Sequence, residues 1–285
     1  MAAKSRSRTA RAASLQKRLR RVYIAARRFA RSVRRAIRTL RAAPIGVRVL
    51  VGAVVVLVAW LAVNWVYQVI RKPTELFFPM DAALAKSPPE TWREYGPLFR
   101  EHSTAVITPE LLAALAQVEG GGNPVARTYW RAGPAQNPFE VYKPASSAVG
   151  MYQITDTTFH EAKRYCIHNH VVVEDGPWHD VRSCWFNSLY TRVLPSHAIE
   201  LTSALLDRAV ASVMAHQRKS AILQHKQDLA AVIHLCGAGA GEAFAKRGFR
   251  LAPRQRCGDH DVRDYLVRVS AMKRQFARLA AGQQE

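Results

Sequence analysis

The chain has 285 residues and carries 42 lysines and arginines against 21 aspartates and glutamates, for a formal net charge of +21. This charge is concentrated at one end, because 18 basic residues and no acidic residue lie between Met1 and Lys72, while the remainder holds 24 basic and 21 acidic residues. Most of the chain is therefore close to neutral, which argues against nucleic acid as the partner of the whole protein.

Residues 1–45 form an arginine- and alanine-rich tail without acidic residues. Basic runs beside a membrane-spanning segment commonly contact anionic lipid headgroups, either as a disordered tail or as a helix lying on the lipid surface. We expect anionic membrane lipid to be the main partner of this tail, and nucleic acid or a cytoplasmic protein is the alternative.

Val49–Ile70 is an uncharged run of about 22 residues, long enough for a helix to cross a hydrocarbon core about 30 Å thick. The sequence predicts a transmembrane anchor over residues 46–71, with Trp65 and Tyr67 at its outer interface. The basic segment before it is too long for a cleaved signal peptide, so we expect the anchor to be retained. The positive charge then places residues 1–45 in the cytoplasm and the rest of the chain across the membrane.

Prolines occur at intervals through residues 72–107, so we expect a linker that leads into the domain rather than a packed element. From residue 108 to residue 281 the pattern is mainly helical, and it contains enough apolar residues for the core of one domain. The sequence predicts a first helix from Thr108 to Glu119 and a short strand over Val171–Val173. Four further helices are expected: one capped by Asp156 that runs through Tyr165, one capped by Ser196 that runs to Met214, and two over Gln224–Leu235 and Val262–Leu279.

The four cysteines of the chain all follow the predicted anchor. An even number of cysteines in an oxidising compartment favours disulfides, and pairing of sequence neighbours would give Cys166–Cys184 and Cys236–Cys257. Three connectivities are possible in principle. A metal site is the competing interpretation, because His168, His170 and His179 lie near the first pair, but their spacing matches no zinc pattern well.

Glu119 is the candidate catalytic residue, because it lies on the apolar face of the first predicted helix. Leu112, Leu115 and Glu119 are spaced to share one face, and Glu119 falls at the C-terminal end, where the helix dipole is negative. Burial and the dipole both disfavour the charged carboxylate, as a general acid requires. The three glycines that follow leave the acid accessible to a bulky substrate. The alternative is an ordinary helix-terminal glutamate turned to solvent.

A second run, Gly150-Met151-Tyr152-Gln153, is a plausible wall for a saccharide-binding cleft. The ring of Tyr152 could stack on a sugar, and the amide of Gln153 offers both a donor and an acceptor to sugar hydroxyl and acetamido groups. Either residue could equally be a packing residue at the start of a helix.

Together the two runs resemble the lytic transglycosylase family with a soluble-lytic-transglycosylase-like, lysozyme-like domain. That family shows Glu-Ser-x-x-Asn-Pro followed by Gly-Leu-Met-Gln-Ile-x-Pro-x-Thr, and this chain has Glu119-Gly-Gly-Gly-Asn-Pro and Gly150-Met-Tyr-Gln-Ile-Thr-Asp-Thr. Three features depart from the family. Gly120 replaces the serine, the spacer between the runs is longer, and His234 stands where the late motif has a tyrosine.

The resemblance implies a mainly α, lysozyme-like domain over residues 108–281 that cleaves peptidoglycan without a metal or cofactor. A single glutamate, here Glu119, would protonate the glycosidic oxygen and then accept a proton from the muramyl C6 hydroxyl, giving a 1,6-anhydro end. The resemblance also makes Met151, Tyr152, Gln153, Tyr265 and His234 candidate substrate-binding residues. It implies a single-pass protein of a bacterial inner membrane, with the catalytic domain in the periplasm.

The implied partners are peptidoglycan glycan strands and anionic inner-membrane lipid at the tail, and proteins of an envelope-spanning machine are further candidates. Two other functions stay open at this point. One is a lysozyme-type hydrolase, which needs a second carboxylate such as Asp156 or Glu140. The other is a peptidoglycan-binding scaffold without catalysis, which the loss of the serine and of the late tyrosine would permit.

Overall fold

The structure, a computed structural model, describes residues 38–134, 136–180, 183–217 and 220–282, with Arg20, Arg27, Arg28, Arg31, Arg34 and Arg35. Most of the predicted basic tail therefore lies outside the described residues. The described part of the chain is mainly helical, with 61% of its residues in helices and 9% in strands. It divides into two compact units, residues 1–64 and residues 65–285, which are described separately.

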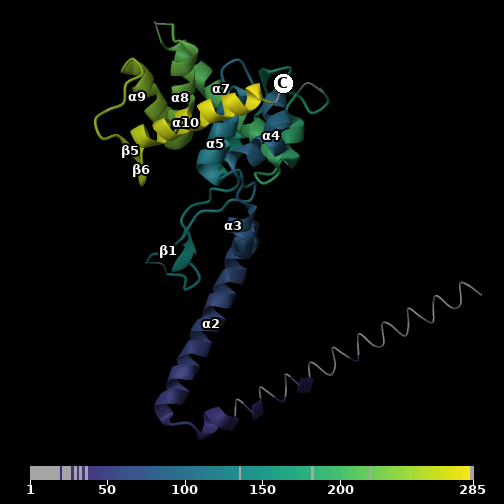
Figure 1. The fold of residues 1–285 in the computed structure, drawn as a ribbon, viewed down its shortest axis with the longest axis vertical. Helices are drawn as coiled ribbons and strands as arrows, with labels where there is room; N and C mark the ends of the chain where they lie inside the picture. The colour runs from purple at the N-terminus through teal and green to yellow at the C-terminus, as the bar shows by residue number, and fades with distance from the viewer. Residues whose placement is uncertain are drawn as a thin grey trace, which may run out of the picture. The chain divides into compact units, whose positions relative to one another are not determined.

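α2 (Ile45–Arg71) is a long apolar helix near the N-terminus (Figure 1). Its 27 residues correspond to about 40 Å at 1.5 Å per residue, more than the roughly 30 Å of a hydrocarbon core. Most of its apolar side chains are exposed, including Leu50, Val55 and Leu57. A helix so apolar with so little of its surface covered could form a single membrane span.

The segment after α2 is folded, which corrects the expectation of a linker over residues 72–107. It forms η1 (Pro73–Met80), α3 (Asp81–Leu84) and α4 (Pro88–Glu101). α4 contributes Trp92, Tyr95 and Phe99 to the hydrophobic core. Two of its prolines fill the first helical positions, where Ser87 and Glu90 form a capping box, and Pro97 lies inside the helix.

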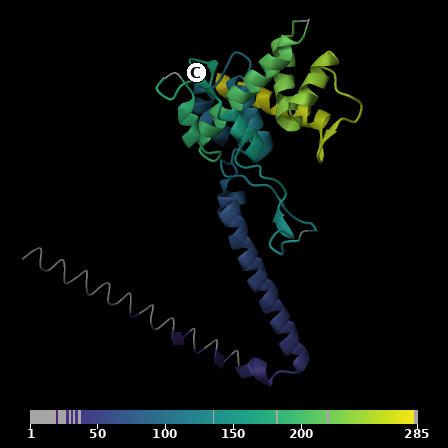
Figure 2. The same ribbon diagram turned by 180° about the vertical axis from the view of Figure 1, so that it is seen from behind.

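Four long helices enclose the core: α5 (Pro109–Gly120), α7 (Pro195–Ala215), α8 (Leu223–Cys236) and α10 (Val262–Ala281). Helix α10 packs against α5, α4 and α8, and both views show it lying across α5 (Figures 1 and 2). The helices expected from residues 108, 196, 224 and 262 all form, with ends that differ by one or a few residues. α9 (Ala238–Lys246) was not expected, because its small and glycine residues give a weak helical pattern.

Shorter elements complete the unit. The predicted strand becomes β4 (Val171–Glu174), which pairs antiparallel with β3 (Tyr165–His168). Two further hairpins were not expected, β1 (Trp130–Ala132) with β2 (Tyr142–Pro144) and β5 (Arg256–Cys257) with β6 (His260–Asp261). The remaining elements are α6 (Asp156–Ala162), whose N-cap is Thr155, and the 3-10 helix η2 (Trp185–Leu189).

The cysteines form the two sequence-local disulfides, Cys166–Cys184 and Cys236–Cys257. The second disulfide ties the end of α8 to the β5–β6 hairpin. Because all four sulfurs are oxidised, Cys166 and Cys184 are not available as thiolate ligands for a metal. Two disulfides in a chain of this kind suggest an oxidising compartment for the residues that follow α2.

Candidate active site

Glu119 lies in the last turn of α5, where two side chains from other helices meet it. The hydroxyl of Tyr265, on α10, donates a hydrogen bond of 2.6 Å to Oε1 of Glu119. Nε2 of His234, on α8, lies 3.8 Å from the same oxygen. The Glu119 side chain is 17% exposed, so the carboxyl is largely shielded from water and still accessible. Glu119 and Tyr265 lie 146 residues apart in the chain, and the α5–α10 packing brings them together.

The phenol of Tyr265 is neutral when it donates its hydrogen bond to the carboxyl of Glu119. Burial, together with the charge and the hydrogen bond of Glu119, raises the pKa of Tyr265 well above its ordinary value. The hydroxyl therefore stays protonated and donates a hydrogen bond to Oε1.

Gly120 has no side chain because the second motif lies directly on it. A Cβ atom at residue 120 would come within 2.7 Å of Cα and 2.9 Å of the carbonyl oxygen of Met151. Real Cβ contacts are not this close, so a serine at 120 would require the backbone at Met151 to move. The departure from the family's serine is therefore tied to the close approach of Gly150–Met151 to α5. Gly150 itself has φ of +80°, which glycine adopts without strain.

The side chains of Met151 and Tyr152 pack inside the domain, which argues against the expected stacking of Tyr152 on a sugar, although Tyr152 is among the residues that line the cavity over Glu119. Both side chains are fully buried. The Tyr152 hydroxyl donates to the carbonyl oxygen of Leu112, and its ring meets the edge of His234. Both residues are packing residues next to Glu119, which is the alternative that the sequence left open.

Gln153 lies at the cleft in a left-handed backbone conformation, with φ of +48°. Its amide nitrogen donates to the carbonyl oxygens of Ala126 and Gly150 at 3.2 and 3.0 Å. Left-handed non-glycine residues are uncommon and occur at functional sites. Here the amide holds the turn that follows Gly150 beside the acid.

A cavity of about 530 Å³ opens over Glu119. One wall is formed by residues 127–129 and 145–148, which flank the β1–β2 hairpin, and another by the β5–β6 hairpin with Tyr265 and Arg268 of α10. The Tyr129 hydroxyl donates to Asp259 at 3.3 Å and so connects these two walls. Sequence reasoning missed Arg127, Tyr129, Asp259 and Arg268, because no motif marks them.

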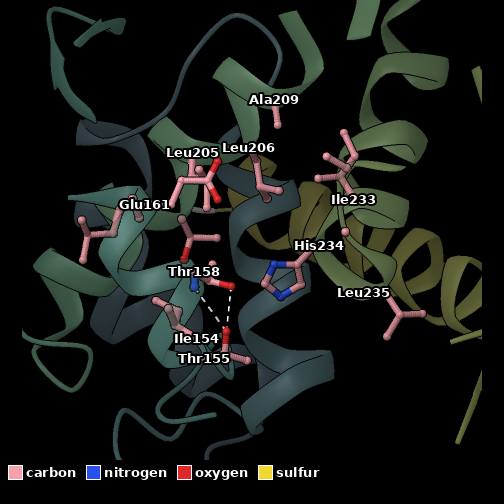
Figure 3. A pocket seen from close by; sticks show the side chains of 15 residues that line it. Ile154, Thr155, Thr158, Glu161, Leu205, Leu206, Ala209, Ile233, His234 and Leu235 are labelled. Atoms are coloured by element: carbon pink, nitrogen blue, oxygen red, sulfur yellow. Dashed lines mark hydrogen bonds between the residues drawn. The ribbon is translucent and has the colours of Figure 1, made fainter. Parts of the chain in front are cut away.

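A second cavity of about 280 Å³ lies between α6, α7 and α8. His234, Leu235 and Thr155 line both cavities, so the two share a wall. Figure 3 shows the imidazole of His234 in this second cavity, facing Thr155 and Thr158. Most other lining side chains are apolar. His234 therefore lies between Glu119 and the second, mainly apolar cavity. This cavity extends the concave surface beyond Glu119.

The two carboxylates considered for a hydrolase do not line the cavity over Glu119. Asp156 forms an ion pair of 2.7 Å with Arg192. Glu140 forms ion pairs with Arg71 and Lys143. Among the described residues, Asp259 is the other carboxylate that lines this cavity besides Glu119.

No protein-family model, no curated protein sequence and no solved structure matches this chain.

Proposed function

We propose that the protein is a membrane-anchored lytic transglycosylase that cleaves peptidoglycan between N-acetylmuramic acid and N-acetylglucosamine. The observation that carries the proposal is the carboxyl of Glu119, shielded at the floor of a 530 Å³ cavity and held through one oxygen by Tyr265. The two sequence runs that resemble the family meet at this carboxyl, since Gly120 packs on Gly150–Met151. A lysozyme-like arrangement of the helices is part of the same proposal.

In the proposed reaction the protonated Glu119 gives its proton to the glycosidic oxygen as the bond from this oxygen to C1 of the muramyl residue breaks. The C6 hydroxyl of the same muramyl residue then attacks C1 and gives its proton to the Glu119 carboxylate. The products are a free N-acetylglucosamine end and a 1,6-anhydro end, and the acid is regenerated without water. Tyr265 stabilises the carboxylate between the two proton transfers, because a hydrogen bond to a charged acceptor is stronger than one to a neutral acceptor.

A single carboxyl suits this reaction better than hydrolysis, which normally uses a pair. The hydrolase alternative rests on Asp259, which lines the cavity and accepts a hydrogen bond from Tyr129. If Asp259 were a general base, Asp259→Asn would abolish cleavage as completely as loss of Glu119 does. A transglycosylase would retain its activity in that variant, with at most a change in substrate affinity.

The protein is proposed to lie in a bacterial inner membrane, with residues 1–45 in the cytoplasm and the domain in the periplasm. The basic tail, the apolar helix α2 and the two disulfides support this topology. Protease added to spheroplasts should digest the part after α2 and leave an N-terminal tag intact. Loss of the N-terminal tag instead would reverse the orientation.

The catalytic assignment is tested with purified full-length protein in detergent, incubated with cell-wall sacculi. Glu119→Gln should abolish release of muropeptides, because it removes the proton donor while keeping size and shape. Glu110→Gln, in the first turn of the same helix, is the matched control and should retain full activity. Equal digestion by the wild type and Glu119→Gln would refute the assignment. Binding to sacculi without cleavage by the wild type would favour the scaffold alternative.

A further inference from the structure

Lys72 is the first residue after α2, and its ammonium group is built into the wall of the cavity. Nζ donates to the carbonyl oxygens of Ala148 at 2.8 Å and Ser146 at 3.2 Å, and lies 3.5 Å from Oγ1 of Thr128. All three partners line the cavity over Glu119. The Lys72 side chain is only 11% exposed. Burial lowers the pKa of its ammonium group, and the nearby carboxylate of Glu75 opposes this change.

Glu75 lies one turn further along and is completely buried. Its Oε2 accepts a hydrogen bond of 2.7 Å from the indole of Trp130 and one of 3.4 Å from Arg127. Its Oε1 lies 3.5 Å from Nζ of Lys72, an ion pair without hydrogen-bond geometry. A buried carboxylate is costly unless it is paired, so Glu75 binds the start of the wall segment to the chain that leaves α2.

The same wall segment reaches the acid through backbone contacts. Arg127 forms a β-bridge with Val149, and the N–H of Gly150 donates to the carbonyl oxygen of Ala126 at 2.8 Å. Gly150 and Met151 are the residues on which Gly120 packs. A continuous set of contacts therefore runs from Lys72 and Glu75 through residues 126–149 to the turn beside Glu119.

We propose that Lys72 and Glu75 are positioning residues for the cavity wall formed by residues 127–129 and 145–148, so that binding of a glycan strand depends on the segment directly after α2. This inference rests on the proposed function. It makes α2 more than a tether, because the chain leaving the helix holds one side of the binding cleft. The wall contributes lining residues rather than the acid, so displacing it should weaken substrate binding more than it slows the chemical step.

The test uses full-length protein in detergent with soluble glycan strands as substrate. Lys72→Met keeps the length of the side chain and removes its charge and donors, and it should raise KM on the order of tenfold with kcat within about twofold of the wild type. Hydrogen exchange should rise in residues 126–149 and stay unchanged in α5 and α10. Lys72→Arg, which keeps the donors, should recover most of the affinity. Lys246→Met, on the exposed face of α9, is the control and should match the wild type.

Glu75→Gln gives an independent test, because its amide oxygen can still accept from Trp130 while the charge is lost. It should show the same increase in KM. If Lys72→Met increases hydrogen exchange throughout the chain, and so unfolds the protein, the KM and the exchange of Glu75→Gln test the inference in its place. Unchanged KM and unchanged exchange over residues 126–149 in an active Lys72→Met protein would overturn the inference and leave the proposed function intact. A wild type that cleaves no glycan, or a Glu119→Gln variant that does, would overturn the proposed function instead. The exchange pattern would then still report whether Lys72 and Glu75 hold the wall.

Discussion

Three residues that are far apart in the chain meet at one carboxyl oxygen. Glu119 lies on α5, His234 on α8 and Tyr265 on α10, and of the latter two Tyr265 makes a hydrogen bond to Oε1 of Glu119. His234, at 3.8 Å, is too far from Oε1 for a hydrogen bond in this state. Tyr265 therefore orients the carboxyl of Glu119. His234 lines both cavities.

Tyr265→Phe should lower kcat by on the order of tenfold or more, because hydrogen bonds to charged groups contribute roughly 1.5–3 kcal/mol. KM should change little, since the phenol is almost completely buried and contacts the acid. Tyr190→Phe is the matched control, because that hydroxyl donates to Glu200, which does not line the cavity over Glu119. Steady-state kinetics on soluble glycan strands would measure both. Equal kcat values for the two variants would contradict the role given to Tyr265.

Gly120→Ser introduces the serine of the motif that this stretch resembles, and it should nevertheless destabilise the protein. The added Cβ would meet the backbone of Met151, and overpacking of this kind costs about 1–3 kcal/mol. Gly133→Ala is the control, because nothing lies within 4 Å of a Cβ at residue 133. Thermal unfolding of both variants in detergent would show the difference. A Gly120→Ser protein as stable as Gly133→Ala would mean that Gly150–Met151 can move away from α5.

At the scale of elements, the long helices are predictable from the sequence and the walls of the cavity are not. The apolar periodicity of residues 108–119, 196–214, 224–235 and 262–279 is sufficient to predict α5, α7, α8 and α10. The prolines of α4 led to the wrong prediction of a linker, because proline occurs at the first positions of a helix as well as in linkers. The wall contacts of Lys72 and Glu75 could not be predicted, since they join residues more than fifty positions apart and no local pattern records them.

The two disulfides should differ in their effect on activity more than in their effect on stability. They close loops of similar length, with separations of 18 and 21 residues, for which the chain-entropy model gives about 3 kcal/mol each. Cys257 belongs to the β5–β6 hairpin, whose turn lines the cavity. We therefore expect Cys236→Ser/Cys257→Ser to lower kcat/KM severalfold and Cys166→Ser/Cys184→Ser to lower it little. Equal losses of activity at equal stability would contradict the role given to the β5–β6 hairpin.

The contact between α4 and α7 should make the fold sensitive to acid. His102 is buried at the end of α4, where it meets Ser196 and Glu200 of α7, and burial lowers its pKa from the ordinary 6.5 while Glu200 and Glu101 oppose this. The folded state then binds fewer protons at this site than the unfolded state, so stability falls as the pH decreases through about 6.5. His102→Gln should flatten the decline in melting temperature between about pH 7 and 5. An unchanged slope would show that other groups cause it.

At the scale of the whole molecule, a long apolar helix is followed at once by a folded helical unit, with no linker between α2 and η1 except Lys72. The charge is asymmetric along the chain, because residues 1–72 hold 18 basic and no acidic residues while the remainder is close to neutral.

The central claim is that one carboxyl, Glu119, cleaves glycan strands without adding water. Mass spectrometry of the muropeptides released from sacculi by the full-length protein tests it directly, because 1,6-anhydro ends are lighter than reducing ends by one water molecule. We predict anhydro ends in the products of the wild type and no products from Glu119→Gln. Reducing ends would contradict the claim and would identify a hydrolase with a second carboxylate at the cavity.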